Sequence, residues 1–205
     1  MKIRYEKELI EIYREMSALD RFVIDFVSVL DKLEIKYVII SGYVSILFGR
    51  SRISEDIDII IEKIDEEGFR NLWNALRENF ECIITKDVGE AYSRYLMANH
   101  AVRFSRKGNP IPNIEMTFPK TGIESWVVSN PKKIRLNGHG MLISPLELQI
   151  PFKLFLGSEK DIEDARHLYR LLADNMDSEL LADFTGKLKV NDAFNKYLRD
   201  KNESA

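Results

Sequence analysis

Two aspartates interrupt an isoleucine-rich run at residues 55–61, where the sequence reads EDIDIII. The β-branched residues predict a buried strand, and side chains along a strand point alternately to its two faces. Asp56 and Asp58 therefore share one face, about 6–7 Å apart, while Ile57 and Ile59 point into a core. Unpaired carboxylates at this separation repel, and each raises the pKa of the other. A divalent cation removes the repulsion, and Mg²⁺ prefers one or two carboxylates with phosphate oxygens and water.

A D-x-D pair alone is more often the solvated side of a half-exposed strand, so neighbouring features have to support the metal hypothesis. Ser41 and Gly42 end a β-branched segment, 36–41, and open a short helix expected at 42–49. At such a turn, backbone N–H groups and a hydroxyl approach a phosphate closely. Arg52 adds a guanidinium nearby. A turn of this kind 14 residues before the D-x-D favours a site for Mg²⁺ and a polyphosphate.

Glu115 is a third candidate acid. It lies in NIEMTF, which predicts a strand at 113–118. A third carboxylate from a neighbouring strand completes a two-metal arrangement, or it accepts the proton of an attacking hydroxyl. Taken alone, Glu115 is equally well explained as a surface residue of an edge strand.

Residues 41–59, SGYVSILFGRSRISEDIDI, resemble the signature of the polymerase-beta-type nucleotidyltransferases. That signature is a small-residue turn, a short helix, an R-x-T-like element and an acid–apolar–acid strand, followed by a third acid on a later strand. Within the superfamily, the sequence is most similar to the small bacterial and archaeal group around the AbiEii-type abortive-infection toxins. Ser41 stands where Gly is commoner and Ser54 where Thr is commoner, and both replacements are small and hydroxylated.

A second block, 143–168, resembles the later motif of the same family. That motif is an S-P-x-x-L helix bearing a lysine, which Lys153 matches, followed by a K-D-x-x-D helix start. Asp161 and Asp164 lie three residues apart on one helix face, where they are expected to hold Lys153 or Arg166. The alternative for Asp161 is an acid that complements the dipole of its helix.

The resemblance implies two-metal transfer of a nucleoside monophosphate from an NTP to an acceptor hydroxyl, with Mg²⁺ or Mn²⁺ as cofactor. Its acceptor classes are tRNA or other RNA, a protein, or a small molecule, and a toxin of this kind would have a cognate antitoxin as partner. The implied site comprises Asp56, Asp58 and Glu115 as catalytic residues and metal ligands, Ser41, Gly42, Arg52, Ser54, Lys153 and Lys160 as nucleotide-binding residues, and Asp161 and Asp164 as supporting residues.

Hydrophobic periodicity divides the chain into an α/β part, residues 1–143, and a helical part, residues 144–205. The expected fold class is α/β (α+β): a mixed β-sheet with flanking helices of the nucleotidyltransferase type, followed by a helical C-terminal part packed on it. Strands are expected at 36–41, 55–61, 81–85, 101–105, 113–118, 132–136 and 140–143, and helices at 42–49, 65–79 and 158–174, with 88–99 ambiguous.

The two ends of the chain give further expectations. Residues 5–33 predict two helices, with Ser17 or Asp20 capping the second. Ser144 and Glu147 predict a capping box at the start of the helical part. The last residues, 201–205, are expected to fray.

Composition limits the other possibilities. The net charge of −3 and the pI of about 5.8 argue against broad nucleic-acid binding, and mildly favour a protein or small-molecule acceptor. The single cysteine and three histidines lack metal-ligand spacing, so a zinc site is not expected. A small basic cluster, Arg103, Arg106 and Lys107, is best explained as a solvated strand end, with a contact to acceptor RNA as the alternative. The sequence lacks an apolar run of about 20 residues, the length that a membrane span needs. Its N-terminus is too strongly charged for a signal peptide, so a cytoplasmic protein without membrane association is expected.

Two other function classes stay open. The first is a nucleotide-binding regulatory or interaction module without turnover. The second is a structural α/β protein with exposed acids. The presence of all three acids, at 56, 58 and 115, argues against a site that has lost its catalytic function. A cluster of carboxylates without a bound cation is electrostatically unfavourable. NTP binding excludes the structural protein, and turnover separates the enzyme from the binding module.

Overall fold

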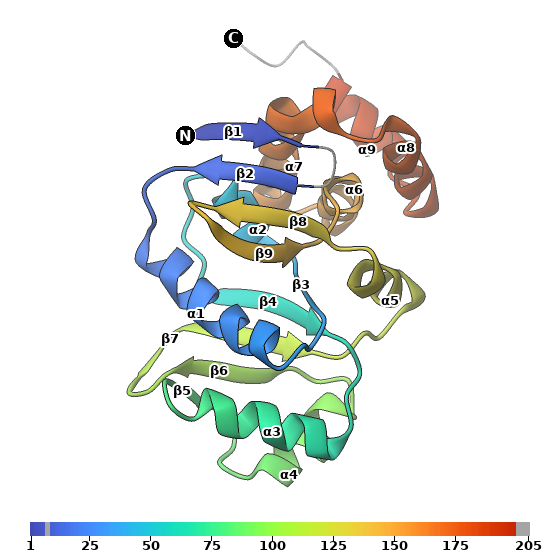
Figure 1. The fold of residues 1–205 in the computed structure, drawn as a ribbon. Coiled ribbons are helices and arrows are strands. Elements are labelled where there is room, and N and C mark those ends of the chain that lie inside the picture. The colour runs from blue at the N-terminus through green and yellow to red at the C-terminus, as the bar shows by residue number, and fades with distance from the viewer. Residues whose placement is uncertain (7–8, 200–205) are drawn as a thin grey trace.

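One mixed sheet forms the centre of the protein, in a computed structural model that describes residues 1–6 and 9–199. Its strands are β1 (Lys2–Tyr5), β2 (Leu9–Tyr13), β3 (Tyr37–Ile39), β4 (Asp56–Ile61), β5 (Phe80–Cys82), β6 (Val102–Arg106), β7 (Asn109–Thr117), β8 (Lys132–Leu136) and β9 (His139–Ile143). Their order across the sheet is β1-β2-β8-β9-β3-β4-β7-β6-β5 (Figure 1). The pairs β2–β8, β9–β3 and β4–β7 are parallel, and the other neighbours are antiparallel. The expected mixed sheet is confirmed.

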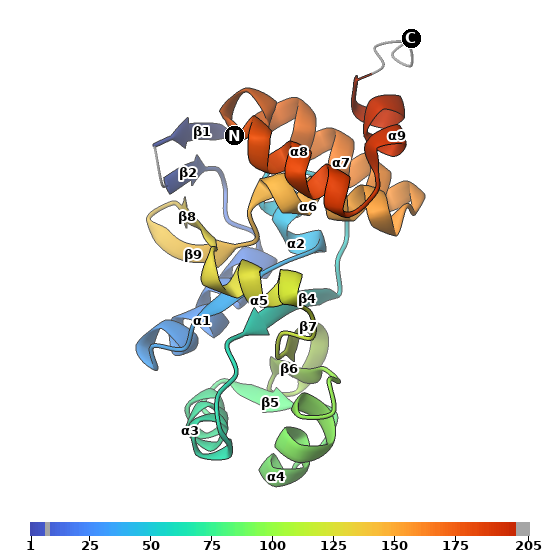
Figure 2. The same ribbon diagram turned by 90° about the vertical axis from the view of Figure 1, so that its right-hand side faces the viewer.

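Helices flank the sheet and follow it. They are α1 (Ala18–Lys32), α2 (Gly42–Leu47), α3 (Glu66–Leu76), α4 (Val88–Glu90) with the π-helical turn η1 (Ala91–Leu96), α5 (Gly122–Ser129), α6 (Leu146–Leu156), α7 (Glu159–Leu172), the 3₁₀ turn η2 (Ala173–Asn175), α8 (Ser178–Lys187), α9 (Asn191–Phe194) and the π-helical turn η3 (Asn195–Arg199). Every described element after β9 is helical, and these helices gather at one end of the molecule (Figure 2). No helix within the described ranges combines the length and apolar character that a membrane span requires.

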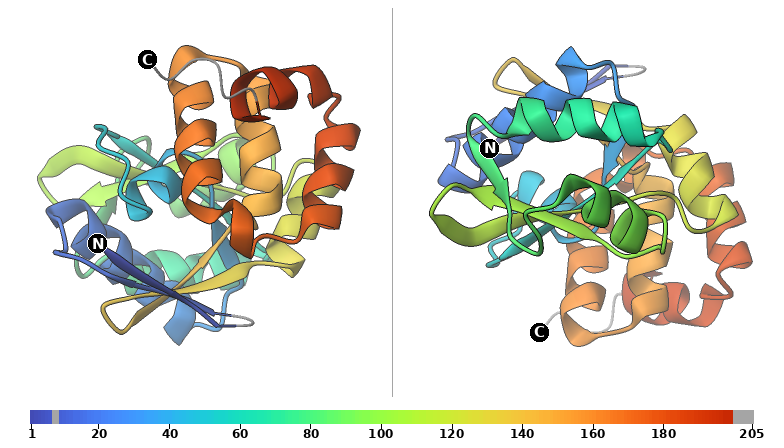
Figure 3. Two further views of the ribbon diagram at one scale, coloured as in Figure 1. Left: turned by 90° about the horizontal axis from the view of Figure 1, so that it is seen from above. Right: turned by 90° about the horizontal axis from the view of Figure 1, so that it is seen from below.

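The two faces of the sheet are covered differently. α1 and α3 pack on one face, where the rings of Phe26 and Phe80 meet edge to face at 5.2 Å between centroids. α5 and the C-terminal helices cover part of the other face, as the views from above and below show (Figure 3). There Leu148 of α6 and Phe184 of α8 belong to a second, smaller apolar cluster that includes Ile60 of β4. This second face is the one that carries the aspartates of β4.

The N-terminal segment differs from the expectation of two helices in residues 5–33. Only the second helix forms, as α1, and the first is replaced by β1 and β2. Apolar residues at 9, 10, 12 and 13 satisfy a helical and an alternating pattern alike, and the sheet decides between them. Ile10 and Ile12 are buried, and the carboxylate of Glu11 accepts a hydrogen bond from Arg135 of β8. Ser17 caps α1 as expected, and Asp20 completes its capping box.

The predicted capping box at the start of α6 is wrong. Pro145 is the N-cap residue, and no side chain caps the helix. Ser144 directly follows β9, and its N–H donates to the carbonyl of Ile39 in β3 at 2.9 Å. The carboxylate of Glu147 instead accepts a hydrogen bond from the N–H of Asp177 at 3.1 Å.

α5 is an element that the periodicity did not predict. It begins at a capping box, in which the Thr121 hydroxyl accepts from the N–H of Glu124 and the Glu124 carboxylate accepts from the N–H of Thr121. The expected fraying of residues 201–205 concerns residues outside the described ranges.

Candidate functional site

The acids of β4 and β7 lie in two adjacent rows across the sheet. Asp56 is in register with Asn113, and Asp58 is in register with Glu115. Both aspartates are on the face of β4 opposite to the fully buried Ile57. Neighbouring strands are about 4.8 Å apart, so Asp58 and Glu115 are direct cross-strand neighbours. The fold thus brings together the three acids that the sequence singled out.

Burial and the repulsion between like charges disfavour the ionised forms of Asp58 and Glu115. Burial raises the pKa of Asp58, and the negative charge of Asp56 raises it further. A hydrogen bond from the Ser41 hydroxyl and the positive charges of Lys153 and Arg103 act in the opposite direction without reversing the shift. The uncompensated negative charge favours a cation at this position.

Glu115 is affected in the same way but has a resident counter-ion. Burial raises its pKa, as do the two aspartates, while Arg103 and Lys120 lower it. Arg103 of β6 is in register with Glu115 and forms an ion pair with its carboxylate. Arg103 is exposed near the start of β6, as expected, and the ion pair is an additional role. Its neighbour Arg106 pairs instead with Asp25 of α1.

Asn113 is a site residue that the sequence did not indicate. Its side-chain amide donates to a carboxylate oxygen of Asp56 at 2.8 Å. The residue is buried, and its amide oxygen has no hydrogen-bond partner among the described residues. Asn113 fixes one carboxylate oxygen of Asp56 and leaves the other available. Only the pairing of β4 with β7 reveals this role, because the two residues are 57 positions apart.

The turn after β3 has an unusual backbone that a distant side chain holds. Ser41 has φ 64° and ψ −132°, a conformation rare outside glycine. The amide of Gln149 in α6 donates to the Ser41 carbonyl at 2.8 Å, and its oxygen accepts from the Ser41 N–H at 3.4 Å. Gln149 is buried, so this double contact fixes the turn beside Asp58.

Arg52 packs directly against the next residue of the turn. A Cβ atom at Gly42 would lie 3.0 Å from a guanidinium nitrogen of Arg52. A larger residue at position 42 would therefore push the guanidinium slightly away from the start of α2. Ser54, on the same loop, donates its hydroxyl to the carbonyl of Asp56 at 2.9 Å and supports the start of β4.

Asp164 gathers the basic residues of the site. It is completely buried and bonds Arg52 at 2.5 Å, Lys153 at 3.0 Å and Arg50 at 3.4 Å. Lys153 is also buried, and its ammonium group reaches Asp161 at 2.8 Å. Burial raises the pKa of Asp161, but hydrogen bonds from Lys153 and Ser158 hold it below its usual value. The two acids thus hold Lys153 rather than Arg166, which pairs with Glu163.

Lys160 lies at the edge of this cluster, where its positive charge helps to lower the pKa of Asp161. It is exposed in the first turn of α7 and forms no ion pair within the described ranges. The structure therefore offers no contact that links Lys160 to the turn.

No three side chains of the metal-binding types His, Cys, Asp and Glu converge on one point in the part of the chain that the structure describes. Asp56 and Asp58 are nevertheless hard oxygen donors with excess negative charge. Such a pair suits Mg²⁺, which is usually bound by one or two carboxylates and completed by phosphate oxygens and water.

Comparison with known proteins bears on the fold. No protein-family profile matches the chain, and no curated protein matches it. Among solved structures, it is similar to an antigenic nucleotidyltransferase-like protein from Paracoccidioides brasiliensis, with a TM-score of 0.50 and 19% identity over 90% of this chain and 94% of that one. A solution structure of the antibiotic-resistance factor ANT(2'')-Ia also aligns, with a TM-score of 0.46 and 11% identity over 88% of this chain and 97% of that one, and we draw nothing from that weaker match. The first similarity shows that the fold is of the nucleotidyltransferase type.

Proposed function

We propose that this chain transfers a nucleoside monophosphate from an NTP to an acceptor hydroxyl. The observation that carries the proposal is the placement of Asp56 and Asp58 on one face of β4, beside a turn held by Gln149. Phosphoryl transfer requires acids that hold a divalent cation and basic groups that neutralise the phosphates, and both kinds of group lie beside this turn. The fold similarity supports the same reaction class.

The turn and the basic cluster are suited to hold the triphosphate. Gly42 would bind its β and γ phosphates through its N–H group, and the Ser41 hydroxyl would join it once it leaves Asp58. Arg52 and Lys153 would neutralise its charge, and Asp164, which bonds both side chains, would orient them. Pre-oriented cations lose little entropy when the phosphates bind.

The acids would hold the divalent cation. Asp56 and Asp58 are its proposed ligands, with Glu115 as a third once its carboxylate leaves Arg103. When bound, Mg²⁺ or Mn²⁺ neutralises the charge of the phosphates and acidifies the attacking hydroxyl.

The reaction balances as a single in-line displacement. The acceptor oxygen bonds to the α-phosphorus, the bond from that phosphorus to its bridging oxygen breaks, and pyrophosphate leaves with the electron pair. The hydroxyl proton passes to the carboxylate of Glu115, which acts as the general base. The protein contributes chiefly alignment and charge neutralisation.

A transfer assay tests the proposal. The protein is incubated with Mg²⁺ or Mn²⁺, each α-labelled NTP in turn, and total RNA or a cell protein extract. We expect label on one acceptor class with the native chain and none with Asp58→Ala. Glu55→Ala is the matched control, because it removes an exposed acid directly before β4 and should leave transfer intact. Transfer that survives Asp58→Ala would refute the assignment.

A nucleotide-binding module without turnover is the second candidate, and one observation favours it. Arg103 already neutralises Glu115, so the site is partly charge-balanced without a cation. NTP binding that raises the melting temperature, with no transfer to any acceptor, would support this module. A toxin role with an antitoxin partner and a cytoplasmic location stay predictions from the sequence.

A further inference from the structure

α6 carries an exposed apolar patch, the aromatic platform, made of Phe152, Phe155 and Leu156. Their exposed fractions are 37%, 58% and 49%. The two rings stack on each other, with 6.1 Å between centroids and 29° between planes. Single exposed apolar residues are ordinary, but stacked aromatic rings beside an aliphatic side chain form a surface that typically binds a partner or ligand.

The platform continues the side of α6 that covers the candidate site. Leu148, Phe152 and Leu156 are four residues apart, so they lie along one helix face. Leu148 is buried in the cluster that contains Ile60. Ile60 is two residues from Asp58 and shares its face of β4. The stripe that begins over the site face of the sheet therefore ends in the exposed side chains of Phe152 and Leu156, and Phe155 stacks beside Phe152.

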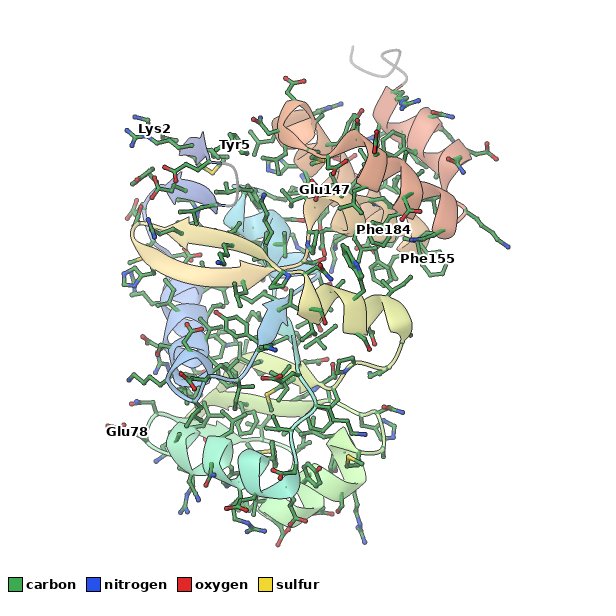
Figure 4. The ribbon with its side chains drawn as sticks, turned by 45° about the vertical axis from the view of Figure 1, so that its right-hand side comes forward. Lys2, Tyr5, Glu78, Glu147, Phe155 and Phe184 are labelled. Atoms are coloured by element: carbon green, nitrogen blue, oxygen red, sulfur yellow. The ribbon has the colours of Figure 1, made fainter. Side chains whose placement is uncertain are left out.

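The same helix supplies the proposed phosphate contacts. Gln149 holds the Ser41 turn, and Lys153 reaches Asp164 one turn later. Phe152 adjoins Lys153 and lies about 4.5 Å along the helix axis from Gln149. Phe155 is on the side of the C-terminal helices that faces α5 (Figure 4). The platform thus begins within one helical turn of the groups proposed to bind the triphosphate.

We propose that the aromatic platform stacks the base of the nucleotide whose phosphates lie at the Ser41 turn, an inference that rests on the proposed function. A base presents a flat, apolar face that matches an exposed aromatic ring. Stacking tolerates any base, and larger purine rings gain more contact than pyrimidines. The platform therefore contributes affinity for all four NTPs, with purines bound more tightly than pyrimidines.

Calorimetric titration in Mg²⁺ separates the contribution of the base from that of the phosphates. The ligands are ATP, CTP and inorganic tripolyphosphate, and the proteins are the native chain, Phe152→Ala and Phe155→Ala. We expect ATP to bind about tenfold more tightly than tripolyphosphate, and either substitution to weaken ATP by about tenfold. Affinity for tripolyphosphate should not change, and CTP should lose less than ATP.

Two further variants serve as controls for this titration. Phe155→Tyr keeps an aromatic ring and should retain the affinity for ATP. Tyr13→Ala removes an aromatic side chain of similar exposure, 39%, from β2 and should change neither ligand. Melting temperatures identify any variant that has lost its fold, and Phe152→Leu, which keeps apolar volume without a flat ring, then replaces Phe152→Ala.

The outcomes distinguish the two proposals. If the native chain binds neither ATP nor tripolyphosphate, the proposed function and the platform both fail. If it binds both equally tightly, or if both alanine variants bind ATP as the native chain does, the platform is refuted while the phosphate site stands. If Phe155→Ala instead abolishes self-association and leaves ATP binding unchanged, the patch is an interface between copies of the chain.

Discussion

Asp20 and Asp164 are both completely buried, yet they are balanced in different ways. Asp20 receives two hydrogen bonds of 2.7 Å from the guanidinium of Arg14, and further bonds from Ser17 and the hydroxyl of Tyr43. One acid thus meets one cation and three neutral donors, which are the N–H and hydroxyl of Ser17 and the hydroxyl of Tyr43. This closed cluster ties the segment before α1 to α1 and α2.

Asp164 is instead shared by several cations. Arg50, Arg52 and Lys153 all bond it. Arg50 also reaches Glu163, and Lys153 also reaches Asp161, but Arg52 has no second acid among the described residues. A buried acid that meets one cation serves the fold, whereas a shared acid gathers several cations that an anionic ligand can also contact. The first expectation from this contrast concerns substitution of each acid.

Asp164→Asn should have the largest effect. Loss of the shared carboxylate leaves buried cations uncompensated, which lowers the free energy of unfolding by about 3 kcal/mol. Transfer should fall about 100-fold, because Arg52 and Lys153 lose their orientation. Inorganic tripolyphosphate should restore part of the lost stability by supplying negative charge, as urea denaturation with and without the ligand would measure. If Asp164→Asn kept the transfer rate of the native chain, Asp164 would not differ from Asp20 in the way described.

Asp20→Asn should destabilise to a similar extent without touching the site. The substitution leaves the guanidinium of Arg14 without its counter-ion, again about 3 kcal/mol. Tripolyphosphate should not restore this loss, and transfer per folded molecule should equal that of the native chain. Recovery of stability on adding tripolyphosphate would show that the two clusters do not differ as described.

Two cross-strand Arg–Glu pairs allow a second comparison. Arg103–Glu115 and Arg135–Glu11 both join neighbouring strands, with arginine side chains 46% and 48% exposed. Arg103→Gln should strengthen Mn²⁺ binding about tenfold, because it removes a competing positive charge and frees Glu115.

Arg135→Gln is the control and should leave Mn²⁺ binding unchanged. Electron paramagnetic resonance titration of free Mn²⁺ provides the measurement. Equal affinities in the two variants would mean that Arg103 does not compete with the cation. Each substitution should alter the free energy of unfolding by less than about 1 kcal/mol, since both arginine side chains are exposed.

The pH dependence of stability gives the smallest expected effect. Burial raises the pKa of Asp20, but hydrogen bonds from Arg14, Ser17 and Tyr43 bring it below its usual value overall. A carboxyl with a lowered folded pKa stabilises the protein above its unfolded pKa of about 3.9. That stability is lost as pH falls through the folded pKa. Urea midpoints measured below about pH 4 should therefore fall more steeply in the native chain than in Asp20→Asn.

Local patterns in the sequence predicted the features that depend on nearby residues. The D-x-D strand, the turn at Ser41 and the cap at Ser17 follow from spacing and residue type alone. The strands β1 and β2 did not follow, because their apolar pattern fits either period and the choice depends on pairing with β8.

Contacts between residues far apart in the sequence could not be predicted from such local patterns. Asn113, Gln149 and Arg103 gain their roles from strand register or from a helix that returns across the sheet. Nothing in the residues beside them signals these roles. The cluster around Asp164 was only partly foreseen, because the motif indicated the acids and Lys153 but not their contact with Arg50.

The bond between Gln149 and Ser41 has a consequence for how the protein is made. The two residues are 108 positions apart, so a growing chain presents the turn long before the helix that fixes it has been translated. The acids of β4 and β7 also precede that helix in the sequence. The candidate site therefore takes its final shape late in synthesis, and a chain released before α6 carries the acids without a properly formed turn.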